Sequence, residues 1–136
     1  VLAADLPATG VIVRRGPVLN GVAPHMADHP PERTFVVAAG PEPTAAEVTA
    51  ALRASGAQLM VIYLPVGSER AARWYAQCAL DAGLGLVNAI PVFLASDRAL
   101  AAAFAAKRLP IIGDDVKSQL GATVTHRVLA DLSGGS

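Results

Sequence analysis

The chain has 136 residues, of which 53% are hydrophobic, enough for one domain with a core of its own. Its 11 basic and 11 acidic residues cancel, so a strongly basic surface for nucleic acid is not expected. The longest apolar run, residues 59–66, is too short to span a membrane, and no signal-peptide pattern is visible; with a single cysteine, Cys78, these features favour a cytoplasmic protein.

Residues 1–43 are predicted to form a loop-rich segment. Prolines at positions 7, 17, 24, 30 and 31 interrupt it and leave little room for long regular elements. Two short strands are expected within it, at residues 11–13 and 34–39, the second ending at Gly40.

From Thr44 onward the pattern becomes regular. Thr44 and Glu47 have the spacing of a capping box, which predicts a helix that ends near Ser55. Residues 59–64 are continuously apolar, as is typical of a strand covered on both faces. Ser68 is the expected N-cap of a second helix that ends at Gly83.

The same alternation continues to residue 132. We expect a second buried strand at 85–90, a third helix capped by Ser96, a short strand at 110–112 and a last helix at about 119–132. Residues 44–132 therefore predict an α/β, Rossmann-like parallel sheet with helices on both faces, in the order αβαβαβα. Residues 133–136 are a flexible, linker-like tail.

Candidate chemistry is concentrated in the turn after the third predicted strand, because parallel sheets bind ligands beyond the carboxyl ends of their strands. Within this turn Asp114 and Asp115 can bind a cation or a sugar hydroxyl, and Lys117 can neutralise a phosphate. The alternative is that the two aspartates and Ser118 only cap the next helix while Lys117 is solvated. Spacing alone leaves both interpretations open.

The other polar candidates point to structure more than to chemistry. His25 and His29 have the spacing of a zinc pair, but the surrounding prolines oppose the helix that would align them. His126 falls inside the last predicted helix. Tyr75 and Cys78 lie on the inner stripe of the second helix and would ordinarily be core residues.

Four long runs resemble a known enzyme family. They are VIYLPVGSE at 61–69, WYAQCALDAG at 74–83, VNAIPVFLASD at 87–97 and GDDVKSQLGATVTHRVL at 113–129. Together with residues 7–11 and Arg15-Gly16, they resemble bacterial myo-inositol-1-phosphate synthase, also called inositol-3-phosphate synthase. The resemblance extends over about residues 6–132, far more than a single glycine motif.

The resemblance implies an NAD-dependent, redox-neutral isomerisation of D-glucose 6-phosphate to 1D-myo-inositol 3-phosphate, in inositol and phospholipid biosynthesis. In that family NAD oxidises the sugar at C5, an enolisation and an intramolecular aldol step close the ring, and NADH reduces the product. It also implies a cytoplasmic homotetramer and a bound mono- or divalent cation.

Residue roles follow from the matching motifs. Tyr75 and Ser118 are implied as NAD contacts, and Ser55 as a further contact through its backbone. Asp115 is implied as a catalytic carboxylate near the nicotinamide, the substrate and the cation, with Lys117 beside it as a catalytic candidate. For Tyr75 and Asp115 the resemblance replaces the structural interpretation.

The family pattern also predicts what this chain lacks. Family members have a glycine-rich first βα unit before the matching region and a C-terminal catalytic domain after it. We therefore expect an incomplete Rossmann-like unit of the synthase that does not catalyse alone. The alternatives are a non-catalytic α/β remnant that binds a nucleotide or a partner, and a different NAD-dependent dehydrogenase with the same sheet.

Overall fold

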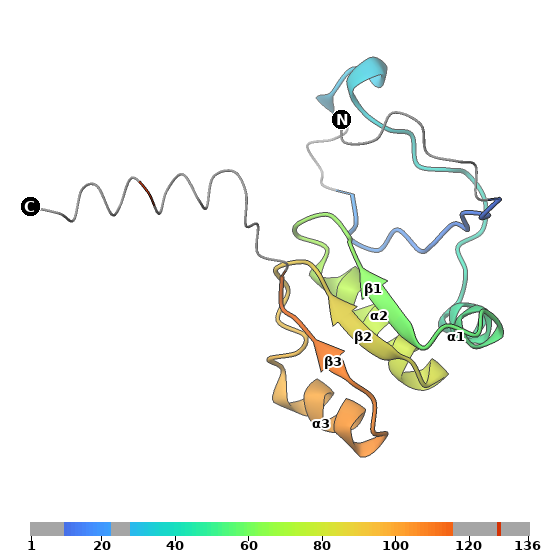
Figure 1. The fold of residues 1–136 in the computed structure, drawn as a ribbon. Coiled ribbons are helices and arrows are strands. Elements are labelled where there is room, and N and C mark those ends of the chain that lie inside the picture. The colour runs from blue at the N-terminus through green and yellow to red at the C-terminus, as the bar shows by residue number, and fades with distance from the viewer. Residues whose placement is uncertain (1–9, 23–27, 116–127, 129–136) are drawn as a thin grey trace, which may run out of the picture.

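The computed structural model describes residues 10–22, 28–115 and 128. Within them a short 3-10 helix, η2, at Pro31–Arg33 precedes an alternation of helices and parallel strands (Figure 1). The elements are α1 at Ala45–Ala54, β1 at Leu59–Ile62, α2 at Glu69–Ala82, β2 at Gly85–Asn88, α3 at Arg98–Ala106 and β3 at Ile111–Ile112.

Helix α1 begins where the sequence predicts. The Thr44 backbone N–H donates to the Glu47 carboxylate at 2.8 Å, and the Glu47 N–H donates to the Thr44 hydroxyl at 3.3 Å. These two bonds form the predicted capping box, and the backbone bond to Thr44 lowers the pKa of Glu47. The helix ends at Ser55, and Gly56 follows with a φ of 69°.

The sheet has the order β1-β2-β3, with both pairs parallel. Leu59 lies opposite Gly85, and Leu86 lies opposite Ile111. Position 85 has to be glycine, because a Cβ there would come within 2.6 Å of the Leu59 side chain and 2.7 Å of the Pro110 ring. The predicted α/β fold class with a Rossmann-like parallel sheet is confirmed over these residues.

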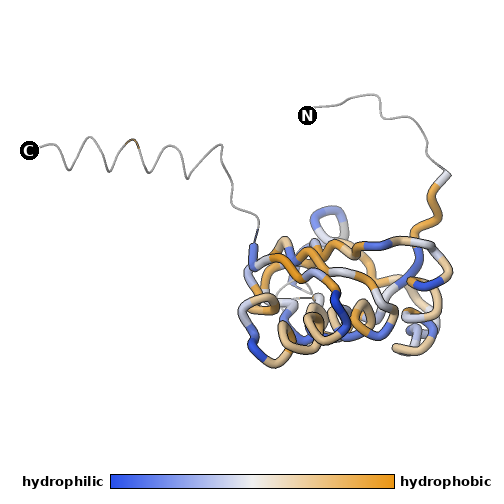
Figure 2. Tube along the Cα trace, turned by 60° about the horizontal axis from the view of Figure 1, so that its bottom comes forward, coloured by the Kyte–Doolittle hydropathy of each residue, from blue (hydrophilic) through white to orange (hydrophobic). Residues whose placement is uncertain are grey.

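Helices α2 and α3 cover the same face of the sheet. Two successive right-handed crossovers that add strands in one direction place both helices on one side. Accordingly, one core cluster joins alternate strand residues to both helices, and the coils run along one side of the strands (Figure 2). Its buried members are Ile62, Ala72, Ala76, Leu80, Leu86, Ile90, Val92, Leu94 and Phe104.

The other face of the sheet is open in the described part of the chain. Leu59 and Val61 are each 51% exposed, and Ile112 is 61% exposed. The prediction that the first strand is covered on both faces is therefore wrong for the described residues. A continuous apolar run indicates that a strand can be buried on both faces. The handedness of the crossover connections determines on which face of the sheet the helices lie.

Other predicted boundaries also change. Residues 11–13 and 34–39 form no strand, and Val13 and Val36 are 92% and 87% exposed, because neither segment pairs with a neighbouring strand. The strands are shorter than predicted. The N-cap of α3 is Asp97 and not Ser96, since the Asp97 carboxylate accepts from the first helical amides. The predicted last helix and the tail lie outside the described residues, apart from the helical Val128.

Helix α2 is packed on two sides, against the sheet and against α1. Its small buried residues Ala71, Ala72, Ala76 and Ala79 allow both neighbours to approach closely. On the α1 side, Cys78 and Thr49 are buried, and burial raises the pKa of the Cys78 thiol, which keeps it protonated. No described helix combines the length and apolarity that crossing a membrane would require.

Candidate functional site

Tyr75 on α2 meets the segment 14–16, which is far from it in sequence. A Cβ on Gly16 would overlap the Tyr75 hydroxyl, so the missing side chain is what lets the phenol reach this backbone. The Tyr75 ring stands edge-on to Trp74, with centroids 4.9 Å apart. Burial raises the pKa of Tyr75, and the hydroxyl therefore remains protonated as a hydrogen-bond donor near neutral pH.

A cavity of about 560 Å³ lies between this segment, α1 and α2. It has the size of a small-molecule site and combines an apolar wall with a few polar groups. The structure thus brings Ser55 and Tyr75, two of the predicted cofactor contacts, to one cavity. Its lining consists of Arg14, Arg15, Gly16, Pro43, Glu47, Val48, Ala51, Leu52, Ala54, Ser55 and Tyr75.

The arginine side of the cavity is held by residues 40–42. The Arg15 guanidinium donates to the Gly40 carbonyl and lies 3.4 Å from the Glu42 carboxylate, which also accepts from the Val18 N–H at 3.1 Å. The Arg15 Nε is buried and has no hydrogen-bond partner among the described residues. Arg14 is exposed and lines the same cavity.

Ser55 contributes the end of a helix to the cavity. Its hydroxyl donates to the Leu52 carbonyl at 2.6 Å and accepts from the Ala57 N–H at 3.2 Å, and its own N–H donates to Ala51 at 3.0 Å. Both donors of Ser55 are therefore engaged in ending α1. The expected backbone contact of Ser55 with the cofactor stays a prediction.

The turn between β1 and α2 is capped by a residue that sequence reasoning missed. The Asn20 side chain accepts from the Ala71 N–H at 3.0 Å and donates to the Gly67 carbonyl at 3.1 Å. Ser68 is the N-cap residue, as predicted, but it is only 1% exposed and makes no side-chain capping bond. Asn20 therefore satisfies a helix-start donor that the turn alone would leave for a ligand.

The Asp114 carboxylate is the centre of a second polar cluster, at the end of β3. It accepts from the backbone N–H groups of Leu94, Ala95 and Ser96 at 2.9, 2.9 and 3.2 Å. Burial favours the neutral acid, but these amides and the Asn88 side chain outweigh it and lower the pKa of Asp114. Asp114 thus braces the β2–α3 loop. The helix-capping role considered from spacing concerns a helix outside the described residues.

Asn88 completes this cluster from the end of β2. It is 1% exposed, and its Nδ2 donates to Asp114 at 2.9 Å and to the Ile90 and Val92 carbonyls at 3.0 and 2.6 Å. A Cβ on Gly113 would lie 3.0 Å from the Asn88 Cβ, so the two backbones approach closely. We call Asn88, Asp114 and the Leu94–Ser96 amides the Asp114 clamp.

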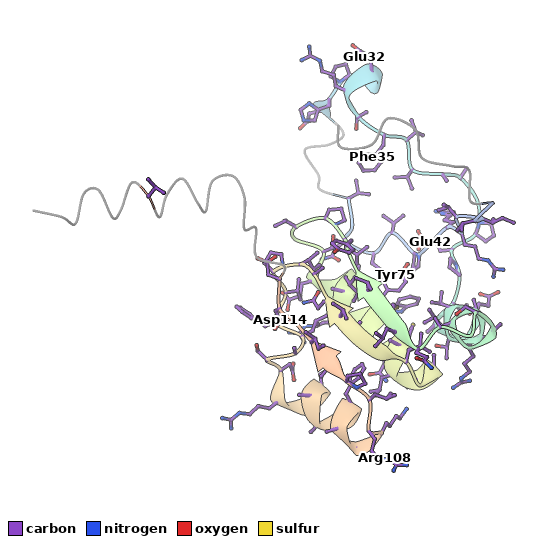
Figure 3. All side chains as sticks on the ribbon, in the orientation of Figure 1. Glu32, Phe35, Glu42, Tyr75, Arg108 and Asp114 are labelled. Atoms are coloured by element: carbon purple, nitrogen blue, oxygen red, sulfur yellow. The ribbon has the colours of Figure 1, made fainter. Side chains whose placement is uncertain are left out.

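Asp115 follows the clamp and is exposed, with a φ of 83°. It does not line the cavity at Ser55 and Tyr75, and Figure 3 shows Asp114 near the end of β3 and Tyr75 toward the 10–22 segment. Lys117 and Ser118 lie outside the described residues, so the full predicted grouping stays a prediction. Among the described residues, no group of three or more His, Cys, Asp or Glu could hold a metal ion.

These features define an α/β domain of the Rossmann-like class, with a nucleotide-sized cavity beside its second helix and a braced acidic turn at a strand end. No family model matches the chain. It is 50% identical over 129 residues to inositol-3-phosphate synthase from Mycobacterium tuberculosis, 49% to the one from Mycolicibacterium smegmatis and 50% to the one from Corynebacterium glutamicum. Each match covers 95% of this chain and 33% of the relative.

The predicted resemblance is thereby confirmed: over 95% of its length the chain is about 50% identical to proteins named inositol-3-phosphate synthase. It spans about a third of the length of the curated relatives that it matches. Among solved structures it is similar to the crystal structure of Ari2, with a TM-score of 0.62 and 37% identity, over 66% of this chain and 27% of that one.

Proposed function

We propose that this chain forms part of the NAD-binding region of an inositol-3-phosphate synthase, which converts D-glucose 6-phosphate to 1D-myo-inositol 3-phosphate without net oxidation. The observation that carries the proposal is the 50% identity over 95% of the chain to synthases of that name. Because the chain spans a third of those relatives, we propose that it supplies one part of the active site and does not turn over substrate alone.

The cavity supports a nucleotide cofactor. Its apolar wall can take a flat ring, the Tyr75 hydroxyl is a neutral donor, and Ser55 presents the end of α1. Bound NAD would accept a hydride from the sugar and later return it, which is chemistry that no side chain of this chain provides. The contribution of the chain is to bind and orient that cofactor.

The acidic turn supports contact with the sugar or with a cation. Asp115 is a non-glycine residue in the left-handed region, and backbone outliers of this kind cluster at functional sites. The Asp114 clamp holds Asp114, the residue directly before Asp115, in place. We propose that the Asp115 carboxylate hydrogen-bonds a sugar hydroxyl or holds a cation, and that Lys117 and Ser118 act beside it on negative charge and on the cofactor.

The test is a chimera in which this chain replaces the matching third of the Mycolicibacterium smegmatis synthase. We expect NAD-dependent formation of inositol phosphate from glucose 6-phosphate, and its loss in the Asp115→Asn chimera. The matched control is Asp28→Asn, an exposed acid, which should leave the rate unchanged. A folded chimera that binds NAD but forms no inositol phosphate would contradict the proposal.

A second candidate, a non-catalytic α/β module that packs against a partner protein, is favoured by the open face of the sheet. Leu59, Val61 and Ile112 present apolar side chains there. The chimera separates the two candidates, because only the first predicts product. A cytoplasmic location is proposed with either, and it is supported by the single buried thiol of Cys78.

A further inference from the structure

Asn88, the last residue of β2, is buried and has both of its side-chain polar atoms engaged within the protein. Its Nδ2 donates to the Asp114 carboxylate at 2.9 Å and to the carbonyls of Ile90 and Val92. Its Oδ1 accepts from the Ile90 N–H at 3.4 Å. A buried amide that is paired in this way is held for the sake of its neighbours. Any effect of this side chain on a reaction must therefore pass through the residues that it holds.

The segment Gly113–Asp114 is held against the end of β2 in two ways. A Cβ on Gly113 would lie 3.0 Å from the Asn88 Cβ and 3.1 Å from the Asn88 carbonyl oxygen, so the two backbones are in close contact. The Asp114 carboxylate is then bonded by Asn88 on β2 and by the amides of the Leu94–Ser96 loop. Asn88 is thus the side-chain donor of the Asp114 clamp, and a neutral donor suits a position 2.9 Å from a carboxylate.

Asp115 directly follows this anchored pair and is exposed. Its φ of 83° is a conformation that a residue other than glycine keeps when the surrounding structure imposes it. Because the peptide unit between Asp114 and Asp115 is planar, the orientation of the Asp114 backbone determines where the Asp115 Cα lies. A displacement of Asp114 is therefore passed on to the Asp115 carboxylate.

We propose that Asn88 is a positioning residue for Asp115: through its bond to Asp114 it holds the acidic turn where the Asp115 carboxylate can meet the sugar or its cation. This role deepens the proposed function and rests on it for what Asp115 does. A purely structural Asn88 would affect the number of folded molecules, so NAD binding and product formation would fall together. A positioning residue lowers the rate of each folded molecule and leaves NAD binding unchanged, since the cavity at Ser55 and Tyr75 is not lined by the clamp.

The test uses the chimera with the Mycolicibacterium smegmatis synthase. Titration with NAD counts the folded sites, and product formation gives kcat per NAD site. Asn88→Asp keeps the size of the side chain but opposes two carboxylates. We expect it to lower kcat per site about a hundredfold at about pH 8, the cost of displacing a reacting group by about 1 Å, with the Kd for NAD unchanged. Asn88→Ala removes the donor and should lower kcat per site to a similar extent.

Acidification should restore Asn88→Asp and not Asn88→Ala. Two adjoining carboxyl groups share a proton well above the ordinary aspartate pKa of about 3.9, and the protonated acid can then donate to Asp114 as the amide does. Between about pH 8 and about pH 5.5 the ratio of the unsubstituted to the Asn88→Asp kcat should therefore shrink about tenfold. The ratio to Asn88→Ala should stay constant.

The matched control is Gln77→Glu. Gln77 is exposed on α2, and its Nε2 donates to the Asp81 carboxylate at 2.9 Å, the same pairing of amide and carboxylate away from the acidic turn. The control should leave kcat unchanged at both pH values. An equal loss in Gln77→Glu would overturn the positioning role of Asn88, as would a loss in Asn88→Asp that does not depend on pH.

The count of NAD sites excludes a structural explanation. If product falls only in proportion to the number of NAD sites, or if the Asn88 variants bind no NAD at either pH, the role is structural and the proposal is wrong. If the variants match the unsubstituted chimera per site, positioning by Asn88 is wrong while the proposed function stands. If the unsubstituted chimera binds NAD but forms no inositol phosphate, the proposed function fails, and the role of Asn88 fails with it.

Discussion

The cavity at Tyr75 and the Asp114 clamp differ in whether their polar groups are paired within the protein. In the clamp, one carboxylate accepts from three backbone amides and one side-chain amide, so its charge is used within the protein. In the cavity, Arg14 makes no hydrogen bond or ion pair with another described residue, and the Tyr75 hydroxyl lies against the backbone of Gly16. The comparison teaches that a conspicuous acidic motif can be structural, while residues joined by no motif form the place where a ligand fits.

The largest effect on stability is expected when the central carboxylate of the Asp114 clamp is removed. Asp114→Ala leaves four donors without their acceptor, and we expect the free energy of unfolding to fall by about 3 kcal/mol. Urea denaturation followed by circular dichroism measures it. Asp28→Ala, at an exposed position, should change stability by less than about 0.5 kcal/mol. Equal effects of the two substitutions would show that the clamp carries no special stability.

The contact between Gly16 and Tyr75 can be tested by filling it. Gly16→Ala forces the Tyr75 ring away, and we expect a loss of about 2 kcal/mol in stability from overpacking. In a Tyr75→Phe background the hydroxyl is gone, and the same substitution should cost less than about 1 kcal/mol. If the cost is the same in both backgrounds, the hydroxyl does not approach Gly16 as described.

The charge of Asp114 also predicts a pH dependence. Burial opposes ionisation, but the amide bonds outweigh it, so the pKa of Asp114 is lower in the folded chain than in the unfolded one. The resulting stability is fully present above the unfolded pKa of about 3.9 and is lost as pH falls through the folded value.

Asp114→Asn should therefore flatten the acid limb of the stability curve relative to wild type. The effect is smaller than that of Asp114→Ala, because a neutral oxygen still accepts some of the bonds. The measurement is the urea midpoint between pH 2 and pH 6. A difference between the two proteins that stays constant with pH would contradict the assignment.

The smallest effect on stability is expected from substitutions of Asp115. Its φ of 83° suits glycine, so Asp115→Gly should raise stability by up to about 1 kcal/mol, while Asp115→Asn should be nearly neutral. Both substitutions should abolish product formation in the chimera. Stability gained with activity retained would show that the strained backbone has no functional purpose.

Local signals were enough to predict much of the fold. The capping box at Thr44, the helix end at Gly83 with its φ of 82° and the alternation of helices and strands each depend on residues close together in the chain. The likeness to inositol-3-phosphate synthases was also visible in the sequence, because long ordered runs survive in it. For the same reason the position of the acidic turn, directly after a strand, was predicted correctly.

Only the tertiary structure decided which groups meet. Asn20 caps a helix start 51 positions away, Asp114 accepts from an amide 20 positions away, and Gly16 makes room for the Tyr75 hydroxyl. It also decided that the described helices α2 and α3 lie on one face of the sheet, since crossover direction determines where helices lie. Such contacts depend on how the elements pack against one another, and the residues that make them are too far apart in the chain for a local pattern to encode.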